Sequence, residues 1–104
     1  MTPAEVWEGL ARGELVAVDV REPYEWEAGH IAGAAFIPLG EIIERAGELP
    51  SDRPLAMVCR TGSRSGMAAD AFHAAGLDTR NLAGGMVAWV AAGLPVEPDG
   101  GRVM

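Results

Sequence analysis

The residues best suited to chemistry lie in the segment CRTGSRSG, residues 59–66. This segment holds the only cysteine of the chain, Cys59, and two of its eight basic residues, Arg60 and Arg64. A thiolate is a strong nucleophile, and arginine side chains or a helix N-terminus lower the pKa of a cysteine. Main-chain N–H groups in such a turn can converge on an anion. We therefore predict a reactive thiolate in an anion-binding loop. The residues predicted to bind the anion are Arg60, Thr61, Gly62, Ser63 and Arg64.

A simpler reading is that Cys59 is a small buried hydrophobic residue, as most lone cysteines at strand ends are. Burial alone would not require five polar or flexible residues directly after the cysteine. The composition of the loop favours a reactive role.

The position of Cys59 in the predicted fold supports this interpretation. Residues 15–20 and 55–59 are apolar runs typical of buried strands, and Cys59 ends the second run. Strands alternate with helical segments over short connections, which predicts an α/β fold whose parallel sheet has helices on both faces. Ligands bind at the carboxyl ends of the strands in such sheets. The other expected elements are short strands at 34–38 and 78–82, and helices at 2–12, 23–28, 39–49, 65–76 and 84–93.

Two of these helices have a predicted buried face. In residues 39–49 the inward side chains are expected to be Ile42, Ile43, Ala46 and Leu49. In residues 65–76 they are expected to be Met67, Ala71, Phe72 and Ala75.

The composition limits the classes of function. A chain of 104 residues predicts one domain, and a net charge of −7 argues against nucleic-acid binding. No run approaches the roughly 18 apolar residues of a membrane span, and the N-terminus lacks a secretory signal, so we expect a cytoplasmic protein. One cysteine and two distant histidines, His30 and His73, make a zinc site improbable. We expect no metal, no cofactor and a monomer.

Three motifs together resemble the single-domain rhodanese family: DVREPYEWEAGHIAGAAFIPL at 19–39, CRTGSR at 59–64 and LAGGMVAWVAAGLPV at 82–96. The resemblance implies a three-layer rhodanese-like domain with a parallel sheet of four to five strands. It also implies a sulfurtransferase in which Cys59 takes a sulfane sulfur from a small anionic donor such as thiosulfate. The resulting persulfide would pass its sulfur to a nucleophilic acceptor, which is cyanide in vitro or a protein or small thiol.

Two other functions are weighed against this one. The related dual-specificity phosphatases have a Cys-x5-Arg loop, whereas Cys59 and Arg64 form the shorter Cys-x4-Arg, so a cysteine phosphatase or arsenate reductase is less favoured. A rhodanese-like binding or regulatory module with little turnover is the main alternative. Such modules often lack the cysteine or have an altered loop. This chain retains both the cysteine and the family's loop, which favours the enzyme.

Asp19, Arg21 and His30 lie in the first motif. We favour structural roles for all three over tuning of the loop by Asp19 and Arg21 or a general-base role for His30. Arg21 would pair with Glu25, Asp19 would anchor nearby main chain, and His30 would pack and hydrogen-bond. The chain starts almost directly with a helix, so the first edge strand of the family is expected to be missing. Residues 97–104 are expected to be a flexible tail or to cover the exposed edge of the sheet.

Overall fold

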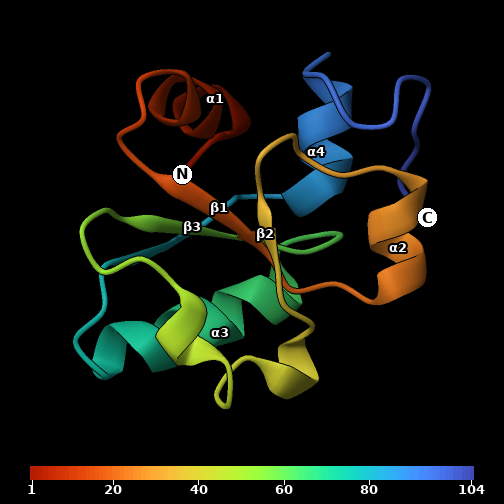
Figure 1. The fold of residues 1–104 in the computed structure, drawn as a ribbon. Helices are drawn as coiled ribbons and strands as arrows, with labels where there is room; N and C mark the ends of the chain where they lie inside the picture. Colours follow the sequence, from red (N-terminus) through yellow and green to blue (C-terminus); the bar gives the residue numbers. More distant parts are fainter.

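Four parallel strands form the middle layer of the domain, in the order β2-β1-β3-β4 (Figure 1). The structure is a computed structural model that describes all 104 residues. It confirms the predicted α/β fold with a four-stranded parallel sheet, without the additional edge strand. The strands are β1 (Val16–Asp19), β2 (Ala35–Phe36), β3 (Leu55–Val58) and β4 (Thr79–Asn81).

Helices cover both faces of this sheet and produce two separate cores. One face packs against α1 (Pro3–Ala11) and α4 (Gly85–Ala91), the other against α3 (Ser63–Ala74), and α2 (Pro23–Ala28) follows β1. Side chains alternate along a strand, so Ala56 and Val58 lie in the core of α1 and α4, whereas Met57 and Cys59 lie in the core of α3. The cysteine side chain therefore points toward the first turn of α3.

The prediction of one helix over residues 39–49 is wrong. This segment contains two short 3₁₀ helices, η1 (Leu39–Glu41) and η2 (Ala46–Glu48), joined by turns. Gly40 and Gly47 weaken a continuous helix, since glycine is the least favourable helix residue after proline. Of the predicted inward side chains only Ile42 is fully buried, and Ile43 is 81% exposed.

The buried face of α3 also differs from the prediction. Phe72 is buried as expected, but Met67 is 74% exposed, and Ala71 and Ala75 are exposed too. The helix begins two residues earlier than predicted, and its many alanines give a weak apolar pattern. The residues of α3 that are buried are Ser65, Ala68, Ala69 and Phe72.

At its carboxyl end β4 is flanked by the start of the chain, not by the tail. The Met1 amino group donates to the Asn81 carbonyl oxygen (2.8 Å), and the Ala83 N–H donates to the Met1 carbonyl oxygen (2.8 Å). The tail instead bonds to the segment around the end of α2, where the Arg102 N–H donates to the Ala28 carbonyl oxygen (2.9 Å).

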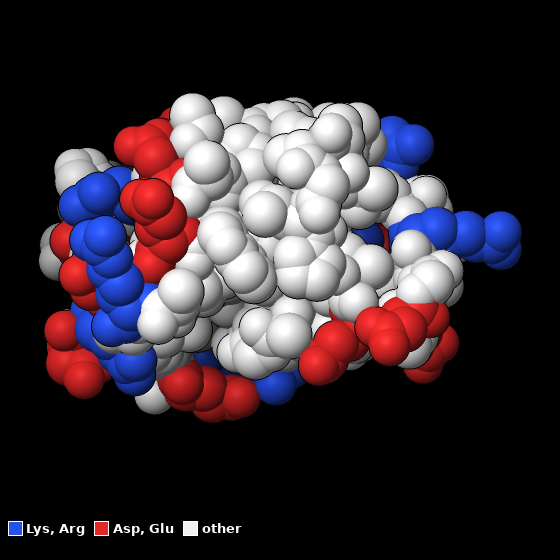
Figure 2. Space-filling model, turned by 90° about the horizontal axis from the view of Figure 1, so that it is seen from above, with Lys and Arg blue, Asp and Glu red and all other residues white.

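The face formed by α1 and α4 has few charged side chains at its centre, and the charged ones lie around its margin (Figure 2). Trp7 from α1 and Val87 and Val90 from α4 are the large hydrophobic side chains exposed on these two helices. None of the helices combines the length and the apolar character that crossing a membrane requires.

Candidate active site

A tight turn between β3 and α3 holds Cys59 at the carboxyl edge of the sheet. Strand β3 ends at Val58 and α3 begins at Ser63, so only four residues connect them. Gly62, the residue before the helix, has a φ of 99°, which side-chain-bearing residues rarely adopt. This glycine allows the chain to turn from β3 into α3 next to the sulfur.

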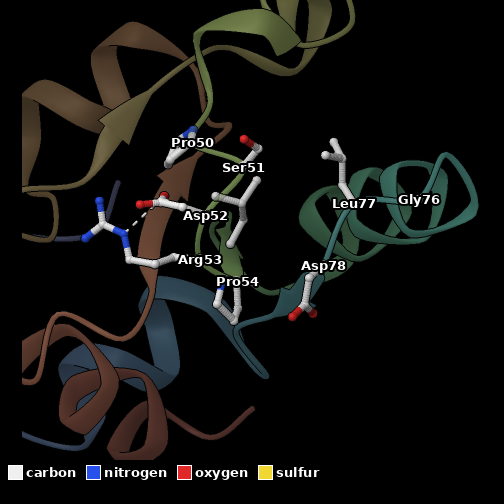
Figure 3. A pocket seen from close by; sticks show the side chains of 9 residues that line it. Pro50, Ser51, Asp52, Arg53, Pro54, Gly76, Leu77 and Asp78 are labelled. Carbon is white, nitrogen blue, oxygen red and sulfur yellow. Dashed lines mark ion pairs between the residues drawn. The ribbon is translucent and has the colours of Figure 1, made fainter.

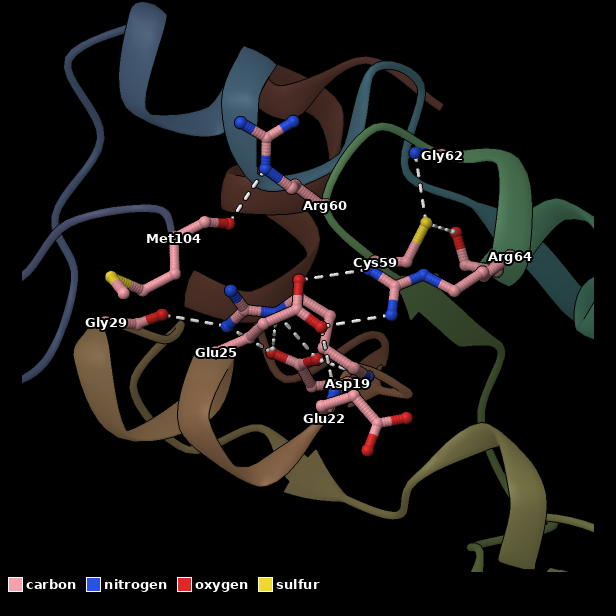
Figure 4. A network of polar contacts seen from close by, with 11 residues as sticks. Asp19, Glu22, Glu25, Gly29, Cys59, Arg60, Gly62, Arg64 and Met104 are labelled. Carbon is pink, nitrogen blue, oxygen red and sulfur yellow. Dashed lines mark hydrogen bonds and ion pairs between the residues drawn. The ribbon is translucent and has the colours of Figure 1, made fainter.

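Hydrogen-bond donors surround the sulfur atom of Cys59. The Gly62 N–H lies 3.0 Å from Sγ, and the Ser65 hydroxyl lies 3.3 Å from it (Figure 4). Burial alone would raise the pKa of Cys59, but hydrogen bonds from the Ser65 hydroxyl and from the main-chain N–H groups of Ser65, Gly62 and Thr61 outweigh it. The pKa of Cys59 therefore lies below its ordinary value, and these donors stabilise the thiolate.

Helix α4 orients the main chain of this loop. The Cys59 carbonyl oxygen accepts a hydrogen bond from the Met86 N–H (2.8 Å), and the Arg60 carbonyl oxygen accepts one from the Val87 N–H (3.0 Å). Gly85 allows this approach, because a Cβ atom there would lie 2.3 Å from the Cys59 carbonyl oxygen. The loop carbonyls are thus bound on the α4 side, while N–H groups of the loop face the sulfur. This contact gives the Gly-Gly of the third motif a physical role.

Two residues of the site were missed by the sequence analysis, Ser65 and Asn81. Ser65 is fully buried in the first turn of α3, and its hydroxyl contacts both Cys59 Sγ and Asn81 Oδ1. The Asn81 Nδ2 group donates to the Gly62 carbonyl oxygen (2.9 Å), which orients the amide with Oδ1 toward the serine. The available sequence signal was the position of Ser65, because first-turn residues of a helix that follows the loop lie close to it.

The two loop arginines contact protein groups. Arg64 makes a bidentate ion pair with Glu25, with Nη1–Oε1 and Nη2–Oε2 distances of 3.0 Å (Figure 4). The Arg60 Nε–H donates to the main-chain oxygen of Met104 (2.8 Å). Each guanidinium group therefore has a protein partner that the sequence analysis did not foresee, and the binding of an anion by these arginines stays a prediction.

Thr61 and Ser63 contribute differently from each other. The Thr61 main-chain N–H is directed to Cys59, whereas Ser63 is exposed and makes no hydrogen bond to the sulfur. Of the five residues predicted to bind an anion, Thr61 and Gly62 have N–H groups at the sulfur.

Asp19 and Arg21 form a buried pair beneath the site. Arg21 Nε and Nη2 lie 2.9 and 2.8 Å from the two Asp19 carboxylate oxygens, and Nη2 also donates to the Gly29 carbonyl oxygen. The prediction of an Arg21–Glu25 ion pair is wrong, because Glu25 pairs with Arg64 of α3. The register places Asp19 beside Val58, so the first motif and the cysteine loop meet at one edge of the sheet.

His30 packs against a neighbouring ring and makes a hydrogen bond, as we expected. Its ring stacks on Trp26 with centroids 3.7 Å apart, and its Nδ1 lies 2.8 Å from the Trp26 carbonyl oxygen. Its Nε2 lies 3.9 Å from Glu97, and the structure gives it no contact with Cys59.

No three side chains among His, Cys, Asp and Glu gather closely enough to hold a metal ion. A hollow of about 310 Å³ lies at the opposite, amino-terminal edge of the sheet, between the segment before β3 and the segment before β4 (Figure 3). Its lining residues are Pro50–Leu55 and Gly76–Asp78. It contains an Asp52–Arg53 ion pair but neither a cysteine nor a histidine, so the cysteine loop remains the candidate active site.

Comparison with known proteins agrees with the geometry of this loop. The profile of the rhodanese-like domain family matches residues 2–92. The chain belongs to the rhodanese-like domain family. A rhodanese-related protein of Thermoplasma volcanium has the same fold, with a TM-score of 0.87 and 32% identity over 92% of this chain and 94% of that one.

Relatives of this rhodanese-like domain include proteins named sulfurtransferases. A sulfurtransferase of Allochromatium vinosum is 38% identical over 89 residues, which is 84% of this chain and 83% of that protein. A probable adenylyltransferase/sulfurtransferase of Mycobacterium tuberculosis is 43% identical over 95% of this chain but only 26% of its own length. An HTH-type transcriptional regulator of the same species is 42% identical over 93% of this chain and 44% of its own length. The chain therefore spans less than half of the last two relatives.

Proposed function

We propose that this rhodanese-like domain is a sulfurtransferase that carries a sulfane sulfur on Cys59. The observation that carries the proposal is the set of donors at the sulfur: the Gly62 N–H and the Ser65 hydroxyl are directed to Sγ, and the pKa of Cys59 lies below its ordinary value. A thiolate at this position is a competent nucleophile. The sulfurtransferase names among the relatives support the reaction class.

The first half-reaction transfers sulfur to the protein. With thiosulfate as the donor, the Cys59 thiolate attacks the outer sulfur, an S–S bond forms at Sγ and the donor S–S bond breaks. Sulfite leaves with the electron pair of that bond. The terminal sulfur of the persulfide then carries the negative charge, and N–H groups such as those of Thr61 and Gly62 would stabilise it.

The second half-reaction returns the thiolate. A nucleophilic acceptor, cyanide in the simplest assay, bonds to the terminal sulfur, and the S–S bond to Sγ breaks with its electron pair remaining on Cys59. Because the chain contains no other cysteine, an internal disulfide cannot release the sulfur. The acceptor is therefore a second molecule, either a small thiol or a protein, and ping-pong kinetics are expected.

Intact-protein mass spectrometry tests this proposal. After incubation with thiosulfate we expect a species heavier by one sulfur atom, which cyanide reverses and which Cys59→Ser does not form. Thiocyanate production should follow the same pattern. A thiol persulfide serves as a second donor if thiosulfate transfers nothing. A folded wild-type protein that gains no sulfur from either donor would contradict the proposal.

A binding or regulatory module is the second candidate, because one relative that matches 93% of the chain is a transcriptional regulator. In this case the domain would recognise or regulate a partner and transfer little sulfur. Wild-type protein that resembles Cys59→Ser in the thiocyanate assay would favour this candidate.

A further inference from the structure

The ion pair between Arg64 and Glu25 connects α3 to α2 directly beside the reactive loop. Both distances are 3.0 Å, so each terminal nitrogen of the guanidinium faces one carboxylate oxygen. The Glu25 side chain is only 3% exposed, whereas Arg64 is 34% exposed. Burial would raise the pKa of Glu25, but the hydrogen bonds from Arg64 and from the Glu22 N–H lower it overall, so this carboxylate is ionised.

This ion pair sets the net positive charge near the sulfur of Cys59. The pKa of Arg64 is raised chiefly by its hydrogen bonds to Glu25 and in smaller part by the negative charge of the Cys59 thiolate, which places the guanidinium within electrostatic reach of the sulfur. Glu25 compensates that charge. Arg64 could turn fully toward a bound anion only by leaving Glu25 buried and unpaired, and an unpaired buried charge is strongly unfavourable.

Arg60 does not supply the positive charge that Glu25 compensates on Arg64. Its Nε–H is bound to the main-chain oxygen of Met104, and the side chain is exposed to solvent. The immediate donors to the sulfur are therefore neutral groups, the N–H groups of the loop and the Ser65 hydroxyl. Such a site suits one negative charge on the terminal sulfur better than two charges on the donor.

We propose that Glu25 is a positioning residue that restrains Arg64 and thereby makes the site select monoanionic sulfur donors over dianionic ones. This inference rests on the proposed sulfurtransferase function. Thiosulfate and an aryl thiosulfonate form a matched pair of donors with two and one negative charges. In each case Cys59 Sγ bonds to the sulfane sulfur and the donor S–S bond breaks, with sulfite or an aryl sulfinate leaving with the electron pair.

The test compares kcat/KM for thiosulfate and benzenethiosulfonate in wild type and in Glu25→Gln. Glutamine has the same shape and retains an oxygen to accept the Glu22 N–H, while Arg64 loses its ionic partner. We expect the thiosulfate-to-thiosulfonate ratio to rise about five- to tenfold, the effect of one unit charge a few ångström away under solvent-like screening. An unchanged or lower ratio would overturn the inference.

Two further variants separate Arg64 from a general change of charge. Glu22→Gln removes the same charge from an exposed neighbour that makes no ion pair, and it should change the ratio much less. The double variant Glu25→Gln/Arg64→Gln restores the wild-type net charge at this place, so its ratio should return to that of wild type. A double variant that keeps the raised ratio would show that Arg64 is not responsible. If Glu25→Gln does not fold, as judged by circular dichroism, Arg64→Gln alone should lower the ratio, and an unchanged ratio would overturn the inference.

Alkylation of Cys59 provides a readout that does not depend on sulfur transfer. Iodoacetate is anionic and iodoacetamide is neutral, and both react with the thiolate by displacement of iodide. Glu25→Gln should raise the iodoacetate-to-iodoacetamide rate ratio, and an unchanged ratio would contradict the inference. Loss of turnover with both donors in wild type would refute the proposed function instead, so the two failures are distinguishable.

Discussion

Substitution of Ser65 by alanine should raise the pKa of Cys59 while leaving the rest of the loop intact. The serine hydroxyl lies 3.3 Å from Sγ and is a main cause of the lowered pKa of this thiol. A hydrogen bond to a charged group contributes about 1.5–3 kcal/mol, and one pKa unit corresponds to about 1.4 kcal/mol. Complete loss of such a bond would therefore raise the pKa by about one to two units.

Asn81 reduces this effect. The Ser65 hydroxyl has one proton, and in the neutral thiol state it can donate to Asn81 Oδ1 instead. Turning toward the thiolate gives up that bond, which is worth about 0.5–1.5 kcal/mol. The expected net increase for Ser65→Ala is therefore about one pKa unit, because the Gly62 N–H still contacts the sulfur.

The pH dependence of iodoacetamide alkylation measures this change. Because the folded-state pKa of Cys59 is depressed, the thiolate is present above that pKa and is lost as the pH falls through it. Ser65→Ala should move this loss to higher pH, so that the rate well below the pKa falls about tenfold for one unit. Ser63→Ala is the matched control, since Ser63 is exposed and does not contact Sγ. A pH profile of Ser65→Ala that coincides with wild type would refute the reasoning.

Two further predictions concern the support of the loop. Gly85→Ala should cost about 1–3 kcal/mol more in unfolding free energy than Gly93→Ala, because both glycines have positive φ but only at Gly85 would the new Cβ collide with the loop carbonyls. Equal losses in urea unfolding would contradict this account. Arg21→Met should cost about 3–5 kcal/mol, because it leaves the Asp19 carboxylate buried without its ionic partner. The double variant Arg21→Met/Asp19→Leu should be more stable than Arg21→Met alone, and the opposite order in the same assay would show that the pair is not what stabilises this position.

The sequence predicted the parts of the fold that depend on strong local patterns. The apolar runs at 15–20 and 55–59 contain two strands that pair in parallel, and α1 begins within one residue of its expected start, where Thr2 and Glu5 form a capping box. The prediction of a helix over residues 39–49 failed. The apolar spacing of this segment suited a helix, but its two glycines and the packing of the domain favoured 3₁₀ turns.

The position of the cysteine loop at the sheet edge was predictable from the sequence, but the ion pairs around the loop were not. Four acidic residues, Asp19, Glu22, Glu25 and Glu27, lie close together in the first motif, and spacing alone does not determine which of them binds Arg21 and which binds Arg64. The observed choice depends on the register of β1 with β3, which places Asp19 at the sheet edge and leaves Glu25 on α2 facing α3. The contact between Ser65 and Asn81 joins α3 to β4 and likewise required the tertiary structure.

The hydrogen bonds of Met1 and Met104 have a practical consequence for how the protein is studied. Met1 bonds to the main chain of Asn81 and Ala83, and Asn81 orients both Ser65 and the loop. Met104 bonds to Arg60 of the same loop. An affinity tag fused at either residue would begin within one or two hydrogen bonds of the cysteine loop. Kinetic constants and pH profiles should therefore be measured on protein from which tags at both positions have been removed.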